Sequence, residues 1–385
     1  MKQQFKVLLF LPFIFLSVYF FSLKSDAQPI RLWGTTINGG PTGAGEIFKI
    51  AEDGSGFQVV YNFQGTPTGT GTEPWGDLML CSNGLIYGTD YSGGDSATGV
   101  IFSIDPITYN YIKVHDFHSL EGYLPYSGLI EASDHKLYGV TRDGGTLTDG
   151  VLYSMDPVNN SYNILHNFGS EGRWPQGKLL FIDSTNTLYG LCSGGGVYGY
   201  GVIFSYDISG GIYSELFDFN DTIGSGPEVS LLLGNDGKLY GNTYTGGANQ
   251  CGVIFSYDMT TNTFSKLYDF VASTGKFPMA SLIQANNGKL YGTTYSGGSN
   301  INYGVLFSYD LTDSTYTDLL NYNGFNGGAN QGSLLKGSDG KIYGINYENE
   351  YIFSFDTNTN TQTILLQFNM SNGFQSPAGL IELTH

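Results

Sequence analysis

The chain has 385 residues, and its 34 acidic side chains outnumber its 16 basic ones, so that the net charge is −18. This charge disfavours nucleic acids as partners, because binding to nucleic acid requires a basic surface that releases counterions. It equally disfavours polyanionic glycans, and it favours solubility.

The first 27 residues have the pattern of a secretory signal peptide. Lys2 and Lys6 provide a basic start, residues 7–23 are almost continuously apolar, and Ala27 is the small residue expected before a cleavage site. An uncleaved membrane anchor is the alternative, but the apolar run is short for a bilayer and is interrupted by Pro12. We therefore expect cleavage after Ala27 and export to the periplasm, the cell surface or the medium, with no later membrane span.

One tripeptide, an aliphatic residue followed by an aromatic residue and glycine, repeats along the remaining chain. Its central aromatic residues are spaced by 54, 51, 51, 51, 51 and 52 residues. They are Trp33, Tyr87, Tyr138, Tyr189, Tyr240, Tyr291 and Tyr343. Seven copies at so steady a period predict a radial or stacked repeat array.

A single repeat reads as four short strands. In residues 128–168 the strands are expected at 128–132, 136–141, 150–156 and 162–168, the last with the alternation of a half-buried strand. Four antiparallel strands in about 51 residues are typical of one propeller blade. No segment of the repeat has helical periodicity.

The residues that repeat have mechanical explanations. The glycine after each aromatic residue indicates a crowded inner strand that another backbone passes closely. Glycine pairs at 39–40, 93–94, 144–145, 194–195, 246–247 and 297–298 allow a positive φ where the second strand ends. An aspartate closes the third strand in six copies, and we interpret it as an Asx turn rather than as a calcium or catalytic site. These aspartates are Asp105, Asp156, Asp207, Asp258, Asp310 and Asp356.

The two ends of the repeat region complement each other. The mature chain begins at a second strand, 31–36, and residues 379–383 closely copy the first strand at 128–132. The last segment should therefore complete the first blade and remove exposed strand edges. The sequence predicts an all-β fold in which residues 28–385 form one seven-bladed β-propeller.

The repeat also resembles a known family. The run from Leu290 to Gly298, followed by Gly304-Val305-Leu306-Phe307, is similar to the tandem repeat called GloVer (Gloeo_Verruco). The similarity extends over essentially the whole mature chain, although blade one has Trp33 and blade seven lacks the double glycine. The resemblance implies an exported bacterial propeller without a settled activity. The double glycine is similar to that of kelch propellers.

No catalytic residue, metal or cofactor is expected from the sequence. The histidines fall at scattered repeat positions and cannot readily converge on one metal. They are His115, His118, His135, His166 and His385. The three cysteines, Cys81, Cys192 and Cys251, also occupy different repeat positions, so no disulfide framework repeats, and a Cys192–Cys251 bridge is left open.

Binding is better supported than catalysis. The loops from strand four to the next strand one, and from strand two to strand three, should meet on one face, where non-repeat residues can carry function. Flat aromatic rings beside polar groups suit sugars or protein partners. The candidate ligand-binding residues are Trp75, Tyr91, Tyr123, Arg142, Asp143, Arg173, Trp174, Tyr198 and Tyr200.

Three functions remain open at this point. The favoured one is a monomeric, non-catalytic binding module for a neutral glycan or a protein. A structural or spacer role at the cell surface is the second, and an enzyme acting on polysaccharide or peptide is the third. Propellers carry all three roles, so the fold alone does not decide among them.

Overall fold

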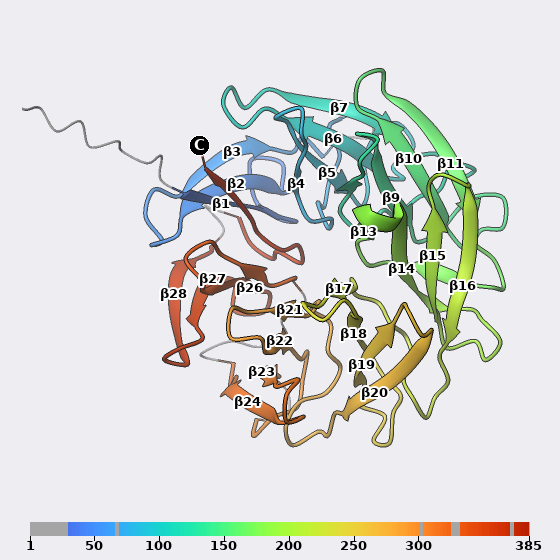
Figure 1. The fold of residues 1–385 in the computed structure, drawn as a ribbon. Helices are drawn as coiled ribbons and strands as arrows, with labels where there is room; N and C mark the ends of the chain where they lie inside the picture. Colours follow the sequence, from blue (N-terminus) through green and yellow to red (C-terminus); the bar gives the residue numbers. More distant parts are fainter. Residues whose placement is uncertain (1–29, 66–68, 301–302, 325–331, 370–372, 385) are drawn as a thin grey trace, which may run out of the picture.

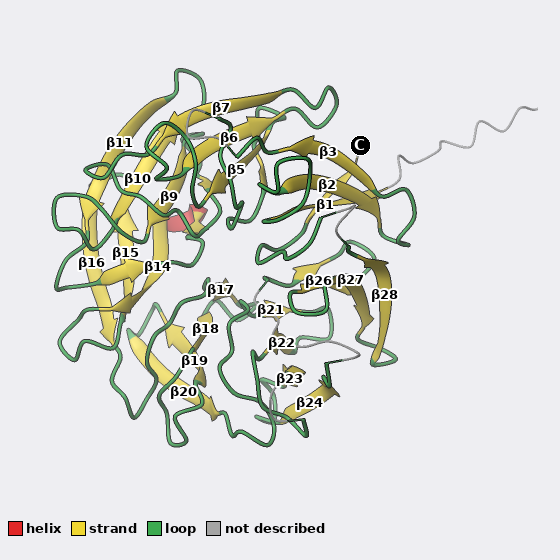
Figure 2. Cartoon of the chain, turned by 180° about the vertical axis from the view of Figure 1, so that it is seen from behind, coloured by secondary structure: helices red, strands yellow, loops and turns green. Residues whose placement is uncertain are grey.

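The structure, a computed structural model, describes residues 30–65, 69–300, 303–324, 332–369 and 373–384. These residues form seven antiparallel sheets arranged as blades around a ring (Figure 1). Apart from the short 3-10 turn η1 (Asp183–Thr185), the described chain is strand and loop (Figure 2). The fold is a seven-bladed β-propeller, as predicted. The expected signal peptide, residues 1–27, lies outside the described ranges.

Each blade runs from a short inner strand to a long outer one. The inner strands are β29 (Ile381–Thr384), β4 (Met79–Leu80), β8 (Ile130–Glu131), β13 (Leu180–Ile182), β17 (Leu232–Leu233), β21 (Ile283–Gln284) and β25 (Leu335–Lys336). The second strands are β1 (Ile30–Thr36), β5 (Ile86–Asp90), β9 (Leu137–Thr141), β14 (Thr187–Gly194), β18 (Leu239–Thr243), β22 (Leu290–Thr293) and β26 (Ile342–Asn346).

The outer half of each blade follows in chain order. The third strands are β2 (Glu46–Ala51), β6 (Val100–Ile104), β10 (Val151–Asp156), β15 (Val202–Asp207), β19 (Val253–Asp258), β23 (Val305–Tyr309) and β27 (Tyr351–Asp356). The fourth strands are β3 (Gln58–Asn62), β7 (Tyr111–Asp116), β11 (Ser161–Asn167), β16 (Ile212–Asp218), β20 (Thr263–Asp269), β24 (Tyr316–Asn321) and β28 (Thr361–Gln367). Blade four has an additional strand, β12 (Arg173–Pro175), which pairs with β14.

The ring closes as the two ends of the repeat region predict. The C-terminal strand β29 pairs antiparallel with β1, with Leu383 opposite Arg31 and Ile381 opposite Trp33. The side chains of Leu380 and Leu383 are buried in the cores on the two sides of this blade. The ring closure is therefore stabilised both by backbone hydrogen bonds and by the burial of apolar side chains, and both edges of β1 are paired.

The apolar cores lie between neighbouring blades. Each core cluster combines side chains of adjacent sheets, such as Tyr87 of β5 with Tyr153 of β10. Second and third strands are almost entirely buried, whereas the fourth strands carry a mixture of half-buried and exposed side chains. Since each blade lies between two cores, the loss of one blade would expose both of them.

The glycine after each aromatic anchor has a different cause from the one expected. A Cβ at Gly88 would lie 2.4 Å from the ring of Phe102, the residue opposite it on β6. The same overlap arises at Gly190, where the ring of Phe204 on β15 is 2.4 Å away. The glycine therefore makes room for a cross-strand aromatic ring, not for a passing backbone as we expected.

The double glycines adopt positive φ as predicted, but in blade four the pair lies one residue later than expected. Its two positive-φ glycines are Gly195 and Gly196, not 194–195, because β14 continues through Gly194. The second glycine of each pair lies against the polar end of the fourth strand. In blade two, for example, a Cβ at Gly94 would lie 2.3 Å from the Asp116 carboxylate. That carboxylate accepts the N–H of the next residue, Asp95, at 2.9 Å.

The aspartates that end the third strands form Asx turns in all six blades. Each Oδ1 accepts the backbone N–H two residues further on, at 2.8–2.9 Å. At Asp310, hydrogen bonds from the Thr312 hydroxyl and N–H lower the pKa of the carboxyl to about 2. The predicted turn role is confirmed.

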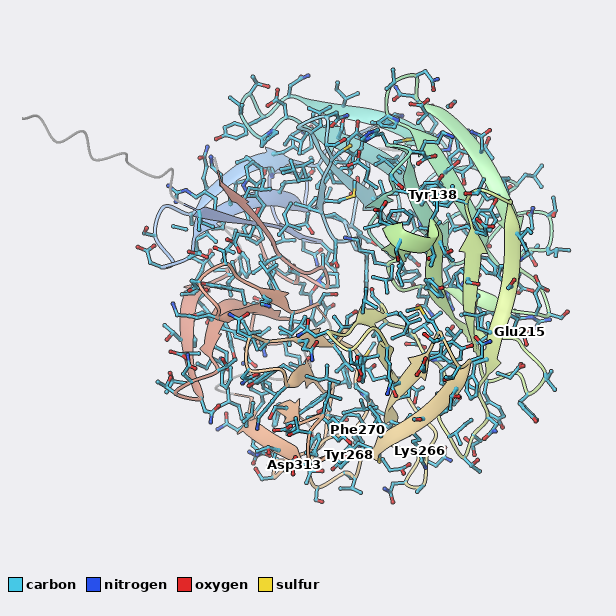
Figure 3. The ribbon with its side chains drawn as sticks, in the orientation of Figure 1. Tyr138, Glu215, Lys266, Tyr268, Phe270 and Asp313 are labelled. Carbon is cyan, nitrogen blue, oxygen red and sulfur yellow. The ribbon has the colours of Figure 1, made fainter. Side chains whose placement is uncertain are left out.

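The outer strands are joined by stacked rings. One ring of each fourth strand lies parallel to a ring of the next blade's fourth strand, with centroids 3.9–4.3 Å apart, in five successive pairs. These pairs are Tyr61–Tyr111, His115–Tyr162, His166–Tyr213, Phe217–Phe264 and Tyr268–Tyr316. The imidazole rings of His115 and His166 therefore pack against tyrosine rings of the next blade. Figure 3 labels Tyr268, which has the corresponding place on the outer strand β20.

A charge repulsion on this outer surface allows a stability prediction. Lys113 and Lys266 pair with the aspartates three residues on, at 2.7 and 2.8 Å. Blade four instead has Glu215 before Asp218, and burial together with Asp218 raises the pKa of Glu215 to about 7. Figure 3 shows Glu215 and Lys266 on the outer strands of neighbouring blades.

Glu215→Lys should raise the melting temperature by removing this repulsion. Solvent screening limits the gain to at most about 1 kcal/mol. Because the folded pKa lies above the unfolded value, wild-type stability falls as pH rises from about 4 through 7. The gain in thermal melts should therefore be larger at pH 8 than at pH 5. The matched variant Lys266→Glu should destabilise. Equal gains at both pH values would contradict the explanation.

Candidate functional site

The two predicted loop sets meet on one face of the ring. Backbone bridges join the loop before strand one to the loop after strand two within the same blade, as between Tyr123 and Asp143. Equivalent bridges are Thr72–Ser92, Ser225–Thr245 and Lys276–Ser296, and Asn38–Phe374 lies across the closure. These paired loops surround the axis and are called the loop face below.

A cavity of about 240 Å³ lies on the propeller axis. Its walls come from the three residues that precede a recurring leucine, which itself lies directly before each inner strand. They are Trp75, Asp77, Tyr126, Ser127, Gly128, Gln176, Gly177, Lys178, Glu228, Val229, Ser230, Met279, Ser281, Ser333 and Pro377. We call this cavity the axial pocket. Every blade contributes to it.

Hydrogen bonds between blades fix part of the pocket wall. The Gly379 N–H donates to Asp77 Oδ1 at 2.6 Å, which ties the closing segment to blade two. The Lys178 N–H donates to Ser230 Oγ at 2.9 Å, and the Ser230 N–H donates to Ser281 Oγ at 3.0 Å. The small polar side chains therefore hold neighbouring inner strands together and give the pocket a hydroxyl-bearing wall.

Three aromatic rings gather at one side of the axial pocket. Trp75 lies 5.5 Å from Tyr126 and 6.0 Å from Tyr91, and the two tyrosine rings are 4.9 Å apart, all between centroids. The guanidinium of Arg142 lies 5.7 Å from the Tyr126 ring centroid, and its Nη1 is 3.3 Å from Asp143 Oδ2. Tyr91, Arg142 and Asp143 belong to loops after second strands, so the aromatic cluster lies on the loop face.

Charged side chains of both signs lie in and beside the axial pocket. Burial lowers the pKa of Lys178, and the neighbouring Asp77 carboxylate opposes that shift. Burial raises the pKa of Glu228, and the positive charge of Arg142 opposes it. Burial also raises the pKa of Asp143, and the positive charge of Arg142 opposes this shift as well. Groups of both signs lie around one cavity, so the pocket is polar without a strong field of either sign.

The structure divides the nine predicted residues into groups. Trp75 lines the axial pocket, and Tyr91, Arg142 and Asp143 join the cluster around it. A second depression on blade four is lined by Arg173, Trp174 and Tyr198, among others, and Tyr200 is part-exposed nearby in sequence. Tyr123 lies in neither group, because its ring covers Gly144 within its own loop pair.

Sequence reasoning missed three important residues of the axial pocket. Tyr126, Lys178 and Glu228 precede inner strands and were not among the candidates. A signal was nevertheless present, since these positions change from blade to blade while the neighbouring leucine repeats. An alignment of the seven copies on that leucine would have identified these three residues as positions that vary between blades.

Among the described residues, no group of three or more His, Cys, Asp or Glu side chains could hold a metal ion. Cys81, Cys192 and Cys251 are buried and unbridged in the described structure, so the open Cys192–Cys251 pairing does not form. Across the described ranges, no helix has the length and apolarity required to cross a membrane.

The sequence profile of the Gloeobacter/Verrucomicrobia repeat matches residues 24–196 and residues 174–385. The chain belongs to this repeat family. The resemblance seen in the sequence is thereby confirmed. No curated protein sequence matches this Gloeobacter/Verrucomicrobia repeat protein.

Solved structures of very different proteins share the fold. A candidate 6-phosphogluconolactonase from Bacteroides uniformis has a TM-score of 0.63 at 12% identity, covering 93% of this chain and 100% of the other. A virginiamycin B lyase from Staphylococcus aureus has a TM-score of 0.57 at 12% identity, covering 81% and 88%. The extracellular domain of a candidate hybrid two-component system from B. thetaiotaomicron has a TM-score of 0.56 at 14% identity, covering 82% and 35%. At such identities the likeness shows the fold alone.

Proposed function

We propose that this Gloeobacter/Verrucomicrobia repeat protein is an exported, non-catalytic binding module that takes a neutral glycan at the axial pocket. The observation that carries the proposal is the cluster of Trp75, Tyr91 and Tyr126 beside a polar cavity with charged groups of both signs. Aromatic faces stack on the apolar faces of sugar rings, and the surrounding hydroxyls and charges can bond to sugar hydroxyls.

Two further features support a neutral ligand. The net charge of −18 repels polyanions. Lys178 lies near the Asp77 carboxylate, and beside the pocket Arg142 lies near the Glu228 and Asp143 carboxylates. A neutral, hydroxyl-rich ligand can hydrogen-bond to groups of both signs without bringing a buried charge of its own.

A purely structural role is less well supported. A spacer would present an even, repeat-like surface, whereas the non-repeat aromatic residues gather around the axis on one face. Export is supported by the basic start, the apolar run and Ala27 in signal-peptide order. Mass spectrometry of the exported protein should find Gln28 at the N-terminus.

The test is binding of residues 28–385 to an array of neutral and charged glycans, with cleavage of the same glycans assayed in parallel. Trp75→Ala should weaken binding of a neutral glycan by about ten-fold or more, because the central ring of a binding surface carries much of its affinity. Val158→Ala is the control, since Val158 is 91% exposed in a turn on the opposite face. Normal binding by folded Trp75→Ala and Arg142→Ala variants would contradict the site, and cleavage products would contradict the non-catalytic role.

A further inference from the structure

A second depression lies beside the axial pocket on blade four. It has a volume of about 400 Å³ and is lined by Ser170, Arg173, Trp174, Gly195, Gly196, Val197, Tyr198 and Gly199. Its apolar side chains are unusually open to solvent, with Trp174 exposed by 37%, Tyr198 by 58% and Val197 by 78%. Exposed apolar groups gathered at one depression are typical of a ligand or partner surface. We call this depression the blade-four platform.

The platform is held in place by the additional strand β12. Arg173 and Pro175 pair with Gly194 and Cys192 of β14. The Trp174 N–H donates to the Asp149 carbonyl at 3.0 Å, and Arg173 Nε lies 3.2 Å from Asp149 Oδ2. Among the described blades, only blade four has such a strand before its inner strand. The Trp174 backbone is therefore fixed before any ligand arrives, which reduces the entropy lost on binding.

The blade-four platform and the axial pocket have lining residues that lie two positions apart in the chain. Trp174 lines the first and Gln176 lines the second, so their Cα atoms are at most about 7 Å apart. Between them, Gln176 Nε2 donates to Ser193 Oγ at 3.1 Å, and Ser193 Oγ donates to the Trp174 carbonyl at 3.1 Å. This polar connection gives a hydrogen-bonding path from one aromatic site to the other.

We infer that the ligand is an oligosaccharide, with one end in the axial pocket and its following units across β12 on the blade-four platform. The inference rests on the proposed function and specifies its ligand class. A single sugar can occupy only one of two separate aromatic sites, whereas a neutral chain reaches both. Affinity should therefore grow with chain length until both sites are filled, because the second contact is made by a ligand that is already held.

The experiment measures calorimetric affinity for neutral gluco- and xylo-oligosaccharides, from the monosaccharide to the hexasaccharide. Wild-type protein should bind the longest chains at least about ten-fold more tightly than the shortest that bind. Trp174→Ala and Tyr198→Ala should remove this gain and leave the affinity for short chains unchanged. Tyr198 is well exposed, so its variant should fold normally. Trp75→Ala should weaken binding at every length, and Val158→Ala at none.

The outcomes separate this inference from the proposed function. Equal affinity at all lengths, or a length gain that both Trp174→Ala and Tyr198→Ala retain, overturns the oligosaccharide inference and leaves glycan binding at the axial pocket standing. Absence of binding at every length, or binding of a peptide in place of these sugars, overturns both.

Discussion

Removal of residues 377–385 is expected to lower the melting temperature of the propeller by about 10 °C or more. The truncation deletes β29, exposes the edge of β1 and takes Leu380 and Leu383 out of the two cores that they fill. Losing one such buried leucine typically costs about 2–5 kcal/mol. The deletion also removes the Gly379 N–H that binds Asp77 across the inner ring.

Thermal melts followed by circular dichroism will measure this effect. Leu383→Ala, which keeps the backbone pairing, should give an intermediate loss of stability. A synthetic peptide of residues 377–385 added to the truncated protein should restore part of the melting temperature, since the vacated edge of β1 can accept it. A truncated protein that melts like the full chain would show that the last strand does not close the ring.

Asp90→Thr is expected to stabilise the protein by about 1–3 kcal/mol at neutral pH, since it replaces a buried polar group that lacks hydrogen bonds. Asp90 ends β5 and is fully buried, and neither carboxyl oxygen has a hydrogen-bond partner among the described residues. At the same position, blades one, three, five and six have Thr36, Thr141, Thr243 and Thr294.

Three of these threonines have the hydrogen bonds that Asp90 lacks. The hydroxyls of Thr141, Thr243 and Thr294 each accept an N–H and donate to a carbonyl, whereas the Thr36 hydroxyl has no partner among the described residues. The Thr243 hydroxyl accepts the Val253 N–H at 3.2 Å and donates to the Thr245 carbonyl at 2.8 Å. A threonine at position 90 would have the corresponding groups of Val100 and Ser92 available. The substitution therefore exchanges an unbonded acid for a hydroxyl with two partners.

The gain from Asp90→Thr should depend on pH. Burial raises the pKa of Asp90 well above its ordinary value. A carboxyl with a raised folded pKa destabilises increasingly as pH rises above its unfolded pKa of about 3.9, until the folded pKa is reached. The stability difference between variant and wild type in urea unfolding should thus be larger at pH 8 than at pH 4. Asp90→Asn should remove this pH dependence, but it should stabilise the protein less than Asp90→Thr does. A difference that stays constant with pH would contradict a buried neutral acid.

The architecture could be predicted because it follows from local sequence patterns that occur seven times. The spacing of the aromatic anchors indicated the blades, and the copy of 128–132 at 379–383 indicated how the ring closes. The Asx turns were also predictable, since an aspartate and the N–H two residues on need no distant partner. Each of these features depends on neighbours in sequence or on direct repetition.

Features that depend on contacts across strands were less accessible. The glycine of the anchor motif was assigned to a passing backbone, yet it accommodates a ring such as Phe102 from the next strand. The glycine pair of blade four was placed one residue early, because only the pairing of β14 shows that Gly194 still belongs to the strand. The sequence shows both sets of glycines, but the reason for each glycine is a contact that depends on how neighbouring strands are paired.

The axial pocket shows the same difference between local patterns and contacts across strands most clearly. The repeat, the propeller, its closure and the loop face could be predicted from the residues, because repetition makes each local pattern visible several times. That Trp75, Tyr126, Lys178 and Glu228 line one cavity, and that Trp174 lines a second depression, became known from the three-dimensional contacts. The pocket is built from the residues that differ between blades, so no repeated pattern marks them. They lie about one repeat apart in sequence and meet only when the ring closes.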